Sequence, residues 1–301
     1  METGLQLNEL SSETQRILIV VTCYNRKNLT IRFLESIKRS NLDSDTFIDI
    51  YLLDDNSPDE TGRVVQKLYP NVHVLFGDGN LYWGGGVRHI LSHIGDRLMM
   101  YDAILFANDD IEFDQVAIAN LREISNKYNA IVGGTVLTKD GRVESSGSRL
   151  GLICKPKVKL LIANGEIQNC QMLPGHILYI PVSIFSKLNF DSKLKYRFID
   201  LELTLRASRG GIPVLLAPTP LALSNDYHNY FIETSSMRGS IAELTRRVLF
   251  HPKGPYWRES MHYLRKVSPL MWWVWFPLFY RAFFVAIILS QLEKLKKFSK
   301  F

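Results

Sequence analysis

The sequence predicts an α/β fold with a mostly parallel, doubly wound sheet. Short apolar runs alternate with segments of helical length through the first hundred or so residues, and this alternation is typical of βαβ units. The chain has 301 residues, 46% of them hydrophobic and 22% charged, which suits one large folded domain with an appendage and excludes disordered and fibrous proteins.

The predicted elements follow one another in a regular order. Strands are expected at residues 17–21, 47–53, 72–76, 103–107 and 213–217, and helices at 29–40, 59–68, 85–100 and from near 115. Polar clusters follow the first four strands, at residues 22–26, 54–57, 77–80 and 108–110. Because ligands of such sheets bind beyond the carboxyl ends of the strands, we expect these four clusters to line one crevice.

Two adjacent acids, Asp109 and Asp110, follow the fourth strand. Like charges in a cleft destabilise each other, and a divalent cation would relieve the repulsion. Mg²⁺ and Mn²⁺ take hard oxygen ligands and few protein carboxylates, so either ion suits this position. The alternative is structural, since Asp110 or Asp114 could cap the helix expected from near residue 115.

Another acid, Asp54, ends the second strand. Ser57, Pro58 and Glu60 have the spacing of a helix-capping box, which explains those three residues by structure alone. Asp54 lies outside that pattern, and its carboxylate could accept hydrogen bonds from a nucleobase or ribose.

The segment 77–89 is a glycine-rich loop that runs into a helix. Glycines allow the close approach of a ligand, and a helix N-terminus attracts phosphate. The loop has neither the GxxxxGK[ST] pattern nor a dinucleotide-binding fingerprint, so ATPases and dinucleotide enzymes are disfavoured. Arg88 could offer charge to a diphosphate, or it could be a solvated helix arginine.

The C-terminal segment 246–301 is basic and rich in tryptophan. It holds 11 Lys and Arg residues against two Glu, and four of the five tryptophans. This composition suits an anionic membrane surface better than nucleic acid. Within it, Pro277 is expected to interrupt the apolar run 269–289 and Arg281 to disfavour a plain span, so we expect a pair of short interfacial helices. The alternatives are a homodimer interface or a buried cap on the catalytic domain.

Two further features indicate the compartment. The first residues lack the pattern of a signal peptide, and three widely spaced cysteines form neither a disulfide framework nor a thiolate zinc site. We therefore expect a cytoplasmic protein that is peripheral on the inner face of the cell membrane.

Five segments taken together carry a family resemblance. In order they are residues 19–26, 53–59, 80–88, 105–110 and 198–206. They resemble the motifs of family-two glycosyltransferases of GT-A fold, particularly the bacterial surface-polysaccharide branch that includes rhamnosyltransferases. The resemblance implies a GT-A-like α/β fold with a nucleotide-binding, doubly wound mixed sheet, followed here by the C-terminal membrane-associating helical tail. The resemblance spans residues 16 to 230. The sequence departs from the family pattern at Asn108, at Ile199 and at Arg88, which puts metal affinity and donor identity in question.

The resemblance implies a role for each candidate residue. Asp200 stands at the position of the general base, Asp110 and His228 at those of metal ligands, Thr22, Tyr24, Arg26, Asp54, Asn80, Arg88, Asn108 and Asp109 on the nucleotide side, and Gly175, His176 and Glu202 on the acceptor side.

Two of these roles have a structural alternative. A carboxylate within reach of the acceptor hydroxyl is what an inverting sugar transfer requires of Asp200, but a helix-start acid paired with Arg206 or Arg209 is the alternative. His228 lies between two tyrosines, where a packed, hydrogen-bonded histidine is the common case.

The sequence therefore predicts inverting, metal-dependent transfer from a nucleoside-diphosphate sugar, such as dTDP-rhamnose or a UDP-sugar. The expected acceptor is a glycan or a lipid-linked sugar of O-antigen or capsule synthesis. The alternatives are a sugar-nucleotide-binding protein without transfer activity and a nucleotidyltransferase. A catalytic domain is expected over 1–245, with a nucleotide half at 16–137 and an acceptor half at 138–245, followed by the tail 246–301.

Overall fold

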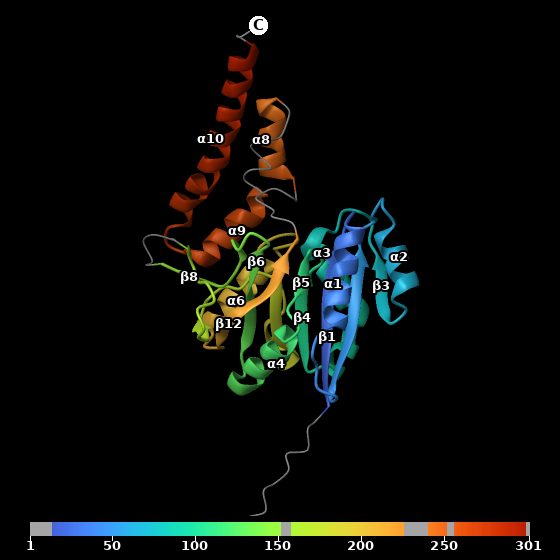
Figure 1. Cartoon of the computed structure of the whole chain (residues 1–301). Coiled ribbons are helices and arrows are strands. Elements are labelled where there is room, and N and C mark those ends of the chain that lie inside the picture. Colours follow the sequence, from blue (N-terminus) through green and yellow to red (C-terminus); the bar gives the residue numbers. More distant parts are fainter. Residues whose placement is uncertain (1–13, 152–157, 226–239, 252–255, 299–301) are drawn as a thin grey trace, which may run out of the picture.

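A mixed sheet with helices on both faces forms the body of the molecule (Figure 1). The computed structural model describes residues 14–151, 158–225, 240–251 and 256–298. Over these residues the ten-stranded sheet runs β10-β12-β6-β11-β4-β1-β2-β3, with β5 paired to β12 and β7 to β6. Its strands are β1 (Gln15–Cys23), β2 (Thr46–Asp54), β3 (Val72–Phe76), β4 (Ala103–Asn108), β5 (Ile111–Phe113), β6 (Ile131–Thr138), β7 (Val143–Ser145), β10 (Gln168–Asn169), β11 (Ile177–Pro181) and β12 (Val214–Ser224).

The helices alternate with the strands in the first half of the chain, as predicted. Along the whole described chain the α-helices are α1 (Lys27–Lys38), α2 (Thr61–Leu68), α3 (Tyr82–Ile94), α4 (Ala117–Tyr128), α5 (Val182–Leu188), α6 (Ile199–Arg209), α8 (Ile241–Phe250), α9 (Trp257–Val267) and α10 (Trp272–Phe298). A 3₁₀ turn (Gly95–Met100) follows α3, and β8 (Ser148–Leu150) pairs with β9 (Val158–Leu160) as a separate hairpin. The prediction missed the short β5 and joined α3 to the 3₁₀ turn as one helix.

Alternate residues of β1 bury on opposite faces of the sheet. Ile17, Ile19 and Val21 pack with side chains of α1, α2 and α4, whereas Leu18 and Val20 pack with side chains of α3, α5 and α6. All five are fully buried, and each contributes about 1.5–3 kcal/mol by leaving water. A strand that is apolar on both faces is what a doubly wound sheet requires, so the predicted fold class is confirmed.

The order of the strands in the sheet reverses at β1. Strands β1, β2 and β3 are parallel and lie side by side in that order. The next strand, β4, is also parallel but pairs with the other side of β1. This reversal is the topological switch point at which ligands bind in such sheets. Beyond β4 the antiparallel β11 makes the sheet mixed.

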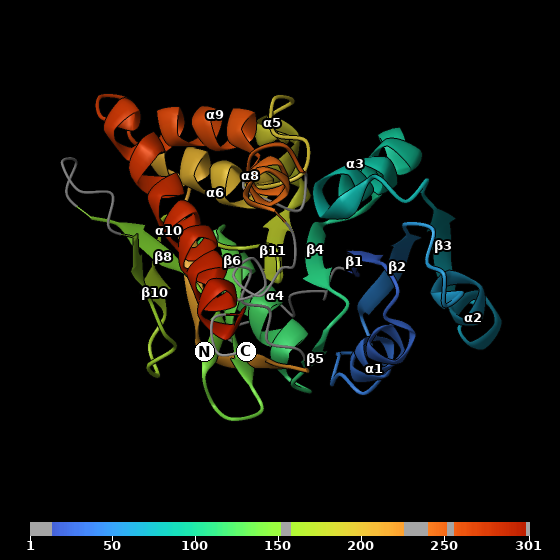
Figure 2. The same cartoon turned by 90° about the horizontal axis from the view of Figure 1, so that it is seen from above.

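The C-terminal helices divide into two groups. Helix α9 lies beside α6 on the body of the molecule (Figure 2), whereas α8 and α10 pack on each other around Leu244, Val248 and Tyr280 and project away from the sheet (Figure 1). The predicted tail therefore contains one helix, α9, that packs beside α6 of the body.

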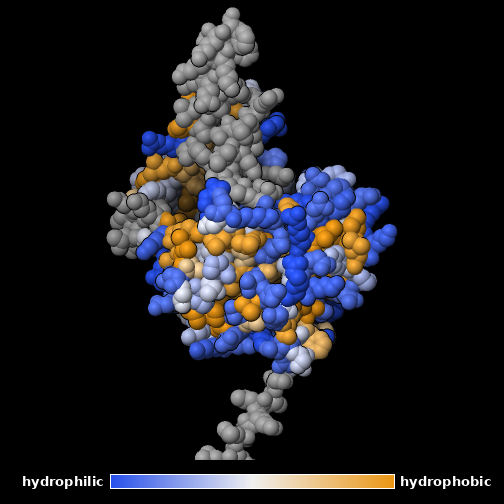
Figure 3. Space-filling view, viewed as in Figure 1, coloured by the Kyte–Doolittle hydropathy of each residue, from blue (hydrophilic) through white to orange (hydrophobic). Residues whose placement is uncertain are grey.

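Helix α10 runs without a break through Pro277, so the predicted interruption at this residue is wrong. Proline removes one backbone hydrogen bond, but Phe276, Phe279 and Phe283 around it pack on the α8–α10 cluster and favour the continuous helix. No helix among the described residues has the length and apolar character that crossing a membrane requires. Hydrophobic residues are visible beside the foot of this projection (Figure 3). Around the start of α10, Leu270 is 75% and Trp273 63% exposed.

Candidate active site

The strand ends meet as the sequence predicts. In the register of the parallel strands Thr22 of β1 lies opposite Asn108 of β4, and Cys23 lies opposite Asp54 of β2. Helix α3 closes over this edge, since a Cβ on Gly86 would lie 2.7 Å from the Thr22 methyl carbon. Three of the predicted nucleotide-side residues are thus neighbours at one edge of the sheet.

The two acids after β4 share an arginine. A guanidinium nitrogen of Arg26 lies 2.6 Å from Asp110 Oδ2 and 3.2 Å from Asp109 Oδ1, and the Thr30 hydroxyl donates to Asp109 Oδ2 at 3.0 Å. Burial raises the pKa of Asp109 to about 7, with the charge of Asp110 adding to the rise and Arg26 and Thr30 opposing it. Arg26 therefore supplies the positive charge that the sequence led us to expect from a cation.

Val116, the N-cap residue of α4, makes no side-chain cap hydrogen bond. Asp114 lies just before it, and its Oδ1 accepts the N–H of Val116 at 3.0 Å, while Asp110 pairs with Arg26. Neither acid is thus the N-cap residue of α4.

The predicted capping box at Ser57 is wrong. The Ser57 hydroxyl accepts the N–H of Asn25, and α2 begins at Thr61 without a side-chain cap from its N-cap residue Glu60. The backbone donors before and at the start of α2 are instead bound by Asp54, which accepts the N–H of Ser57 at 2.8 Å and of Gly62 at 2.6 Å. Asp54 is 2% exposed, and both of its oxygens organise the loop before α2, so any contact with a nucleobase must share them.

Asp55 is a site residue that sequence reasoning missed. Its carboxylate, 5% exposed, accepts the N–H groups of Gly79, Leu81 and Tyr82 at 2.9–3.0 Å. It therefore fixes the glycine-rich loop against the end of β2. The signal was present in the sequence, since Asp55 directly follows the strand-end residue Asp54.

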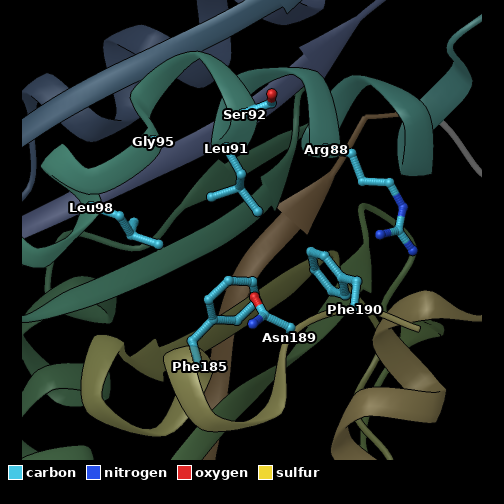
Figure 4. A pocket seen from close by; sticks show the side chains of 8 residues that line it. All are labelled: Arg88, Leu91, Ser92, Gly95, Leu98, Phe185, Asn189 and Phe190. Carbon is cyan, nitrogen blue, oxygen red and sulfur yellow. The ribbon is translucent and has the colours of Figure 1, made fainter. Parts of the chain in front are cut away.

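Arg88 does not join the carboxylates at the strand ends. One guanidinium nitrogen donates to the carbonyls of Asp191 at 2.6 Å and Leu194 at 2.7 Å, and the group lies over the Phe190 ring. It borders a cavity of about 440 Å³ between α3 and α5 (Figure 4), with walls of Leu91, Leu98, Phe185 and Phe190. Arg88 thus binds backbone carbonyls of the loop after α5. The predicted contact with a diphosphate is not what these hydrogen bonds indicate.

Asp200 lies at the second position of α6 and touches the loop before β11. Its Oδ2 accepts the N–H of Gly175 at 2.6 Å, and Gly175 packs so closely on Trp83 that a Cβ there would lie 2.2 Å from the indole ring. The carbonyl of the next residue, His176, accepts the N–H of Asn108 at 3.3 Å. A short path of contacts therefore joins Asp200 to Asn108, Asp109 and Asp110.

The electrostatics of Asp200 suit a proton acceptor. Burial raises its pKa, while the N–H of Gly175 and the nearby His176 oppose the rise. A carboxylate with a raised pKa is a stronger base than an ordinary aspartate. The predicted alternative, pairing of Asp200 with Arg206 or Arg209, is not found among the described residues. Arg206 pairs with Glu202, and Arg209 donates to the carbonyls of Lys266 and Val267.

Glu202 is a structural residue rather than the predicted acceptor contact. Its side chain is 1% exposed and pairs with Arg206 at 2.9 Å and with Lys266 of α9 at 2.6 Å. Lys266 also pairs with Asp191, whose carboxylate accepts a hydrogen bond from His262 Nε2 at 2.8 Å. These partners lower the pKa of Glu202 and of Asp191 despite burial.

The remaining candidates are only partly described. Tyr24 is 46% exposed, and Asn80 is exposed with its N–H donated to Asp78. His228 lies outside the described residues, and the chain before it ends at Asn225, whose N–H donates to the Asp110 carbonyl at 3.0 Å. Among the described residues, no group of three or more His, Cys, Asp or Glu side chains is placed to hold a metal ion.

Unusual backbone conformations cluster around the same edge. Five non-glycine residues with positive φ flank it: Asn25 (55°), Asn56 (62°), Glu60 (60°), Tyr82 (54°) and Phe198 (62°). Such conformations are costly and persist where surrounding contacts fix them, most often at functional sites.

Comparisons with known proteins agree with this geometry. Residues 18–187, more than half of the chain, match the model of a family described as glycosyl transferase family 2. The N-acetylglucosaminyl-diphospho-decaprenol L-rhamnosyltransferase of Mycobacterium tuberculosis (strain ATCC 25618 / H37Rv) is 20% identical over 281 residues, which cover 85% of this chain and 91% of that protein.

Two solved structures share the fold. The mannosyltransferase PcManGT from Pyrobaculum calidifontis, in complex with GDP-Man and Mn²⁺, superposes with a TM-score of 0.53 at 11% identity, covering 93% of this chain and 88% of that one. S. aureus TarS 1–349 in complex with UDP-GlcNAc gives a TM-score of 0.53 at 11% identity, covering 76% of this chain and 63% of that one. The match thus spans less than two thirds of the TarS chain, and both likenesses support a GT-A-like fold.

Proposed function

The chain belongs to glycosyl transferase family 2, and on that premise we propose that it is an inverting glycosyltransferase with Asp200 as its general base. The observation that carries the proposal is the path from Asp200 through Gly175 and His176 to Asn108. It links a carboxylate of raised pKa to the strand ends where such sheets bind nucleotides.

In the proposed reaction the sugar moves from a nucleoside diphosphate to an acceptor hydroxyl. The hydroxyl oxygen forms a bond to the anomeric carbon, and the bond from that carbon to the diphosphate oxygen breaks. The hydroxyl proton passes to the carboxylate of Asp200, a transfer worth about 10²–10⁴ in rate. Asp55 holds the glycine-rich loop beside the donor by its three backbone hydrogen bonds.

The residues at the end of β4 fit a divalent cation. Asp109 and Asp110 offer the hard oxygen donors that Mg²⁺ and Mn²⁺ prefer, and the pair already attracts a positive group, Arg26. We propose that Asp110 and His228 are ligands and that Asp109 and Asn108 face the ribose and the water shell of the ion. When bound, the ion would neutralise charge on the departing diphosphate.

The donor and acceptor are proposed from the relative. The M. tuberculosis protein is named for rhamnose transfer to a decaprenol-linked N-acetylglucosaminyl diphosphate, so dTDP-rhamnose and a lipid-linked acceptor are the first pair to test, and UDP-sugars the second. A role in O-antigen or capsule synthesis would follow from such an acceptor.

We also propose that the tail holds the enzyme on the inner face of the cell membrane. The support is the basic, tryptophan-rich composition of 246–301 and the exposure of Leu270 and Trp273, since such surfaces bind anionic lipid. Full-length protein should sediment with anionic liposomes at low salt, and protein truncated before Ser268, which keeps α9, should not. Full-length protein that stays in the supernatant would refute attachment.

Analysis of the released nucleotide tests the proposed reaction. The protein is incubated with dTDP-rhamnose or a UDP-sugar, a short-chain prenyl-diphosphate-linked N-acetylglucosamine and Mn²⁺. Release of a nucleoside diphosphate with glycosylated acceptor supports glycosyl transfer. Pyrophosphate would instead indicate a nucleotidyltransferase, and nucleotide binding without either product a binding protein.

A further inference from the structure

A buried carboxylate from the tail holds the segment in front of the proposed base. Glu259 of α9 is 2% exposed, and its Oε1 accepts the N–H groups of Lys195 at 3.0 Å and Tyr196 at 3.2 Å. Its Oε2 accepts the N–H groups of Arg197 at 3.0 Å and Tyr196 at 3.3 Å. Three consecutive backbone donors thus surround one carboxylate.

This arrangement couples the helix to the segment energetically. Burying a carboxylate is costly unless donors compensate its charge, and hydrogen bonds to an ionised group are the stronger kind. Any movement of residues 195–197 away from α9 would leave the buried charge of Glu259 without these donors. The backbone of the segment is therefore fixed by a side chain about sixty residues later in the chain.

The other side of the same segment rests on α3. A Cβ on Gly84 would lie 2.6 Å from the carbonyl oxygen of Lys195 and 2.9 Å from that of Tyr196. The Tyr196 ring also meets Tyr82 edge-on, with centroids 5.5 Å apart. Residues 195–197 are thus held between α9, which takes their N–H groups, and the first turn of α3, which faces their carbonyls.

The segment leads directly into the helix of the base. Phe198 adopts φ of +62° as the N-cap of α6, and its ring stacks on Tyr263 of α9 with centroids 4.5 Å apart and planes at 6°. Asp200 follows two residues later. The contacts of α9 with Lys195 to Phe198 consequently set the entry of the chain into α6.

We infer that Glu259 is a positioning residue, which holds residues 195–197 and through them orients the carboxylate of Asp200 toward the acceptor. The inference rests on the proposed function, because it presumes that Asp200 is the base. It assigns α9 of the tail a part in acceptor chemistry that is separate from membrane attachment.

The test compares Glu259→Gln with Glu243→Gln. Both carboxylates lie in the C-terminal helices and accept backbone N–H groups, but Glu243 caps α8 by accepting the N–H of Ser240. Binding of UDP, dTDP and GDP is followed by thermal shift, and kcat and KM for the prenyl-linked acceptor by release of nucleoside diphosphate. Hydrogen exchange of the amides of residues 195–201 reports the segment itself.

We expect Glu259→Gln to keep its affinity for nucleotide and to lose about 10- to 100-fold in kcat/KM for the acceptor. Amide exchange over 195–201 should rise in this variant, and Glu259→Asp, which keeps the charge, should recover part of the loss. Glu243→Gln should match the wild type in both measurements.

Three results would overturn the inference. They are wild-type acceptor kinetics in Glu259→Gln, exchange over 195–201 unchanged by that substitution, and, if Glu259→Gln does not fold, wild-type acceptor kinetics in Glu259→Asp. The proposed function fails separately, if the wild-type protein releases no nucleoside diphosphate or if Asp200→Asn transfers sugar normally. In those cases the exchange measurement still decides whether Glu259 holds the segment.

Discussion

Two clusters of buried acids differ in how their charge is balanced. At the end of β4, Asp109 and Asp110 both pair with Arg26, and the pKa of Asp109 is raised to about 7. Between α6 and α9, Glu202 pairs with Arg206 and Lys266, and Lys266 also pairs with Asp191. The pKa values of Glu202 and Asp191 are lowered in spite of burial.

We propose that this difference in pKa separates structural acids from reactive ones. A lowered pKa means that the folded protein stabilises the ionised acid, so its partners already balance the charge. A raised pKa means that the ionised acid is disfavoured as it stands and that a cation would stabilise it. Asp200 belongs with Asp109 in this respect, although it lies only two residues from Glu202. We therefore propose that charge balance, and not position on α6, distinguishes the roles of Asp200 and Glu202.

A large loss of activity is expected from substitution in the first cluster. Asp110→Asn should lower sugar transfer by about 10²–10³-fold, the usual cost of one lost electrostatic contact at a reacting centre, and should abolish the effect of Mn²⁺ on nucleotide binding. Asp191→Asn, the matched change in the second cluster, should keep the transfer rate and lower the melting temperature. Full activity of Asp110→Asn in the presence of a chelator would contradict the assignment.

A smaller effect is expected where α3 meets the segment before α6. Gly84→Ala places a methyl group against the carbonyls of Lys195 and Tyr196, so the backbone must shift, and we expect a loss of about tenfold in acceptor kcat/KM. Gly85→Ala is the control, because its Cβ would meet the Leu81 side chain at 3.3 Å. Equal kinetics of the two variants would show that the contact is unimportant.

The smallest effect concerns stability in acid. The pKa values of Asp191 and Glu202 are lowered from 3.8 and 4.5, so their contribution is complete above those values and is lost as the pH falls through the lowered ones. These two groups should therefore leave the melting temperature independent of pH near neutrality. They should lower it as the pH falls below about 4.5. The acid-dependent fall should be shallower in Glu202→Gln, and an unchanged fall would contradict the ion-pair network.

Much of the nucleotide side could be predicted because its contacts follow from local pattern. Apolar runs give the strands, parallel strands end at one edge, and Thr22 and Asn108 meet for that reason. The prediction of a capping box at Ser57 failed for a different reason. Asp54, three residues earlier, accepts the backbone N–H groups of Ser57 and Gly62, and the residue types around Ser57 do not show this.

The acceptor side depended on contacts between distant parts of the chain. The spacing of Glu202 and Arg206, four residues apart on a helix, was visible in the sequence, yet Lys266 and Glu259 reach α6 and its preceding segment from more than sixty residues away. These contacts form because α9 packs beside α6 in the folded chain. The spacing of residues along the sequence does not predict that packing. Arg26 was likewise predicted for the nucleotide but not as the partner of Asp109 and Asp110.

The most direct test of the distinction between the two kinds of acid compares Asp200→Asn with Glu202→Gln on α6. We expect Asp200→Asn to lower acceptor-dependent transfer by about 10²–10⁴-fold with an unchanged or higher melting temperature, since burial disfavours the charge that it removes.

Glu202→Gln should keep the rate within a few-fold and lose about 1–3 kcal/mol of stability. This is less than a fully buried pair would lose, because the Arg206 and Lys266 side chains are 35% and 34% exposed. Wild-type transfer by Asp200→Asn together with loss of transfer by Glu202→Gln would contradict the assignment of both residues.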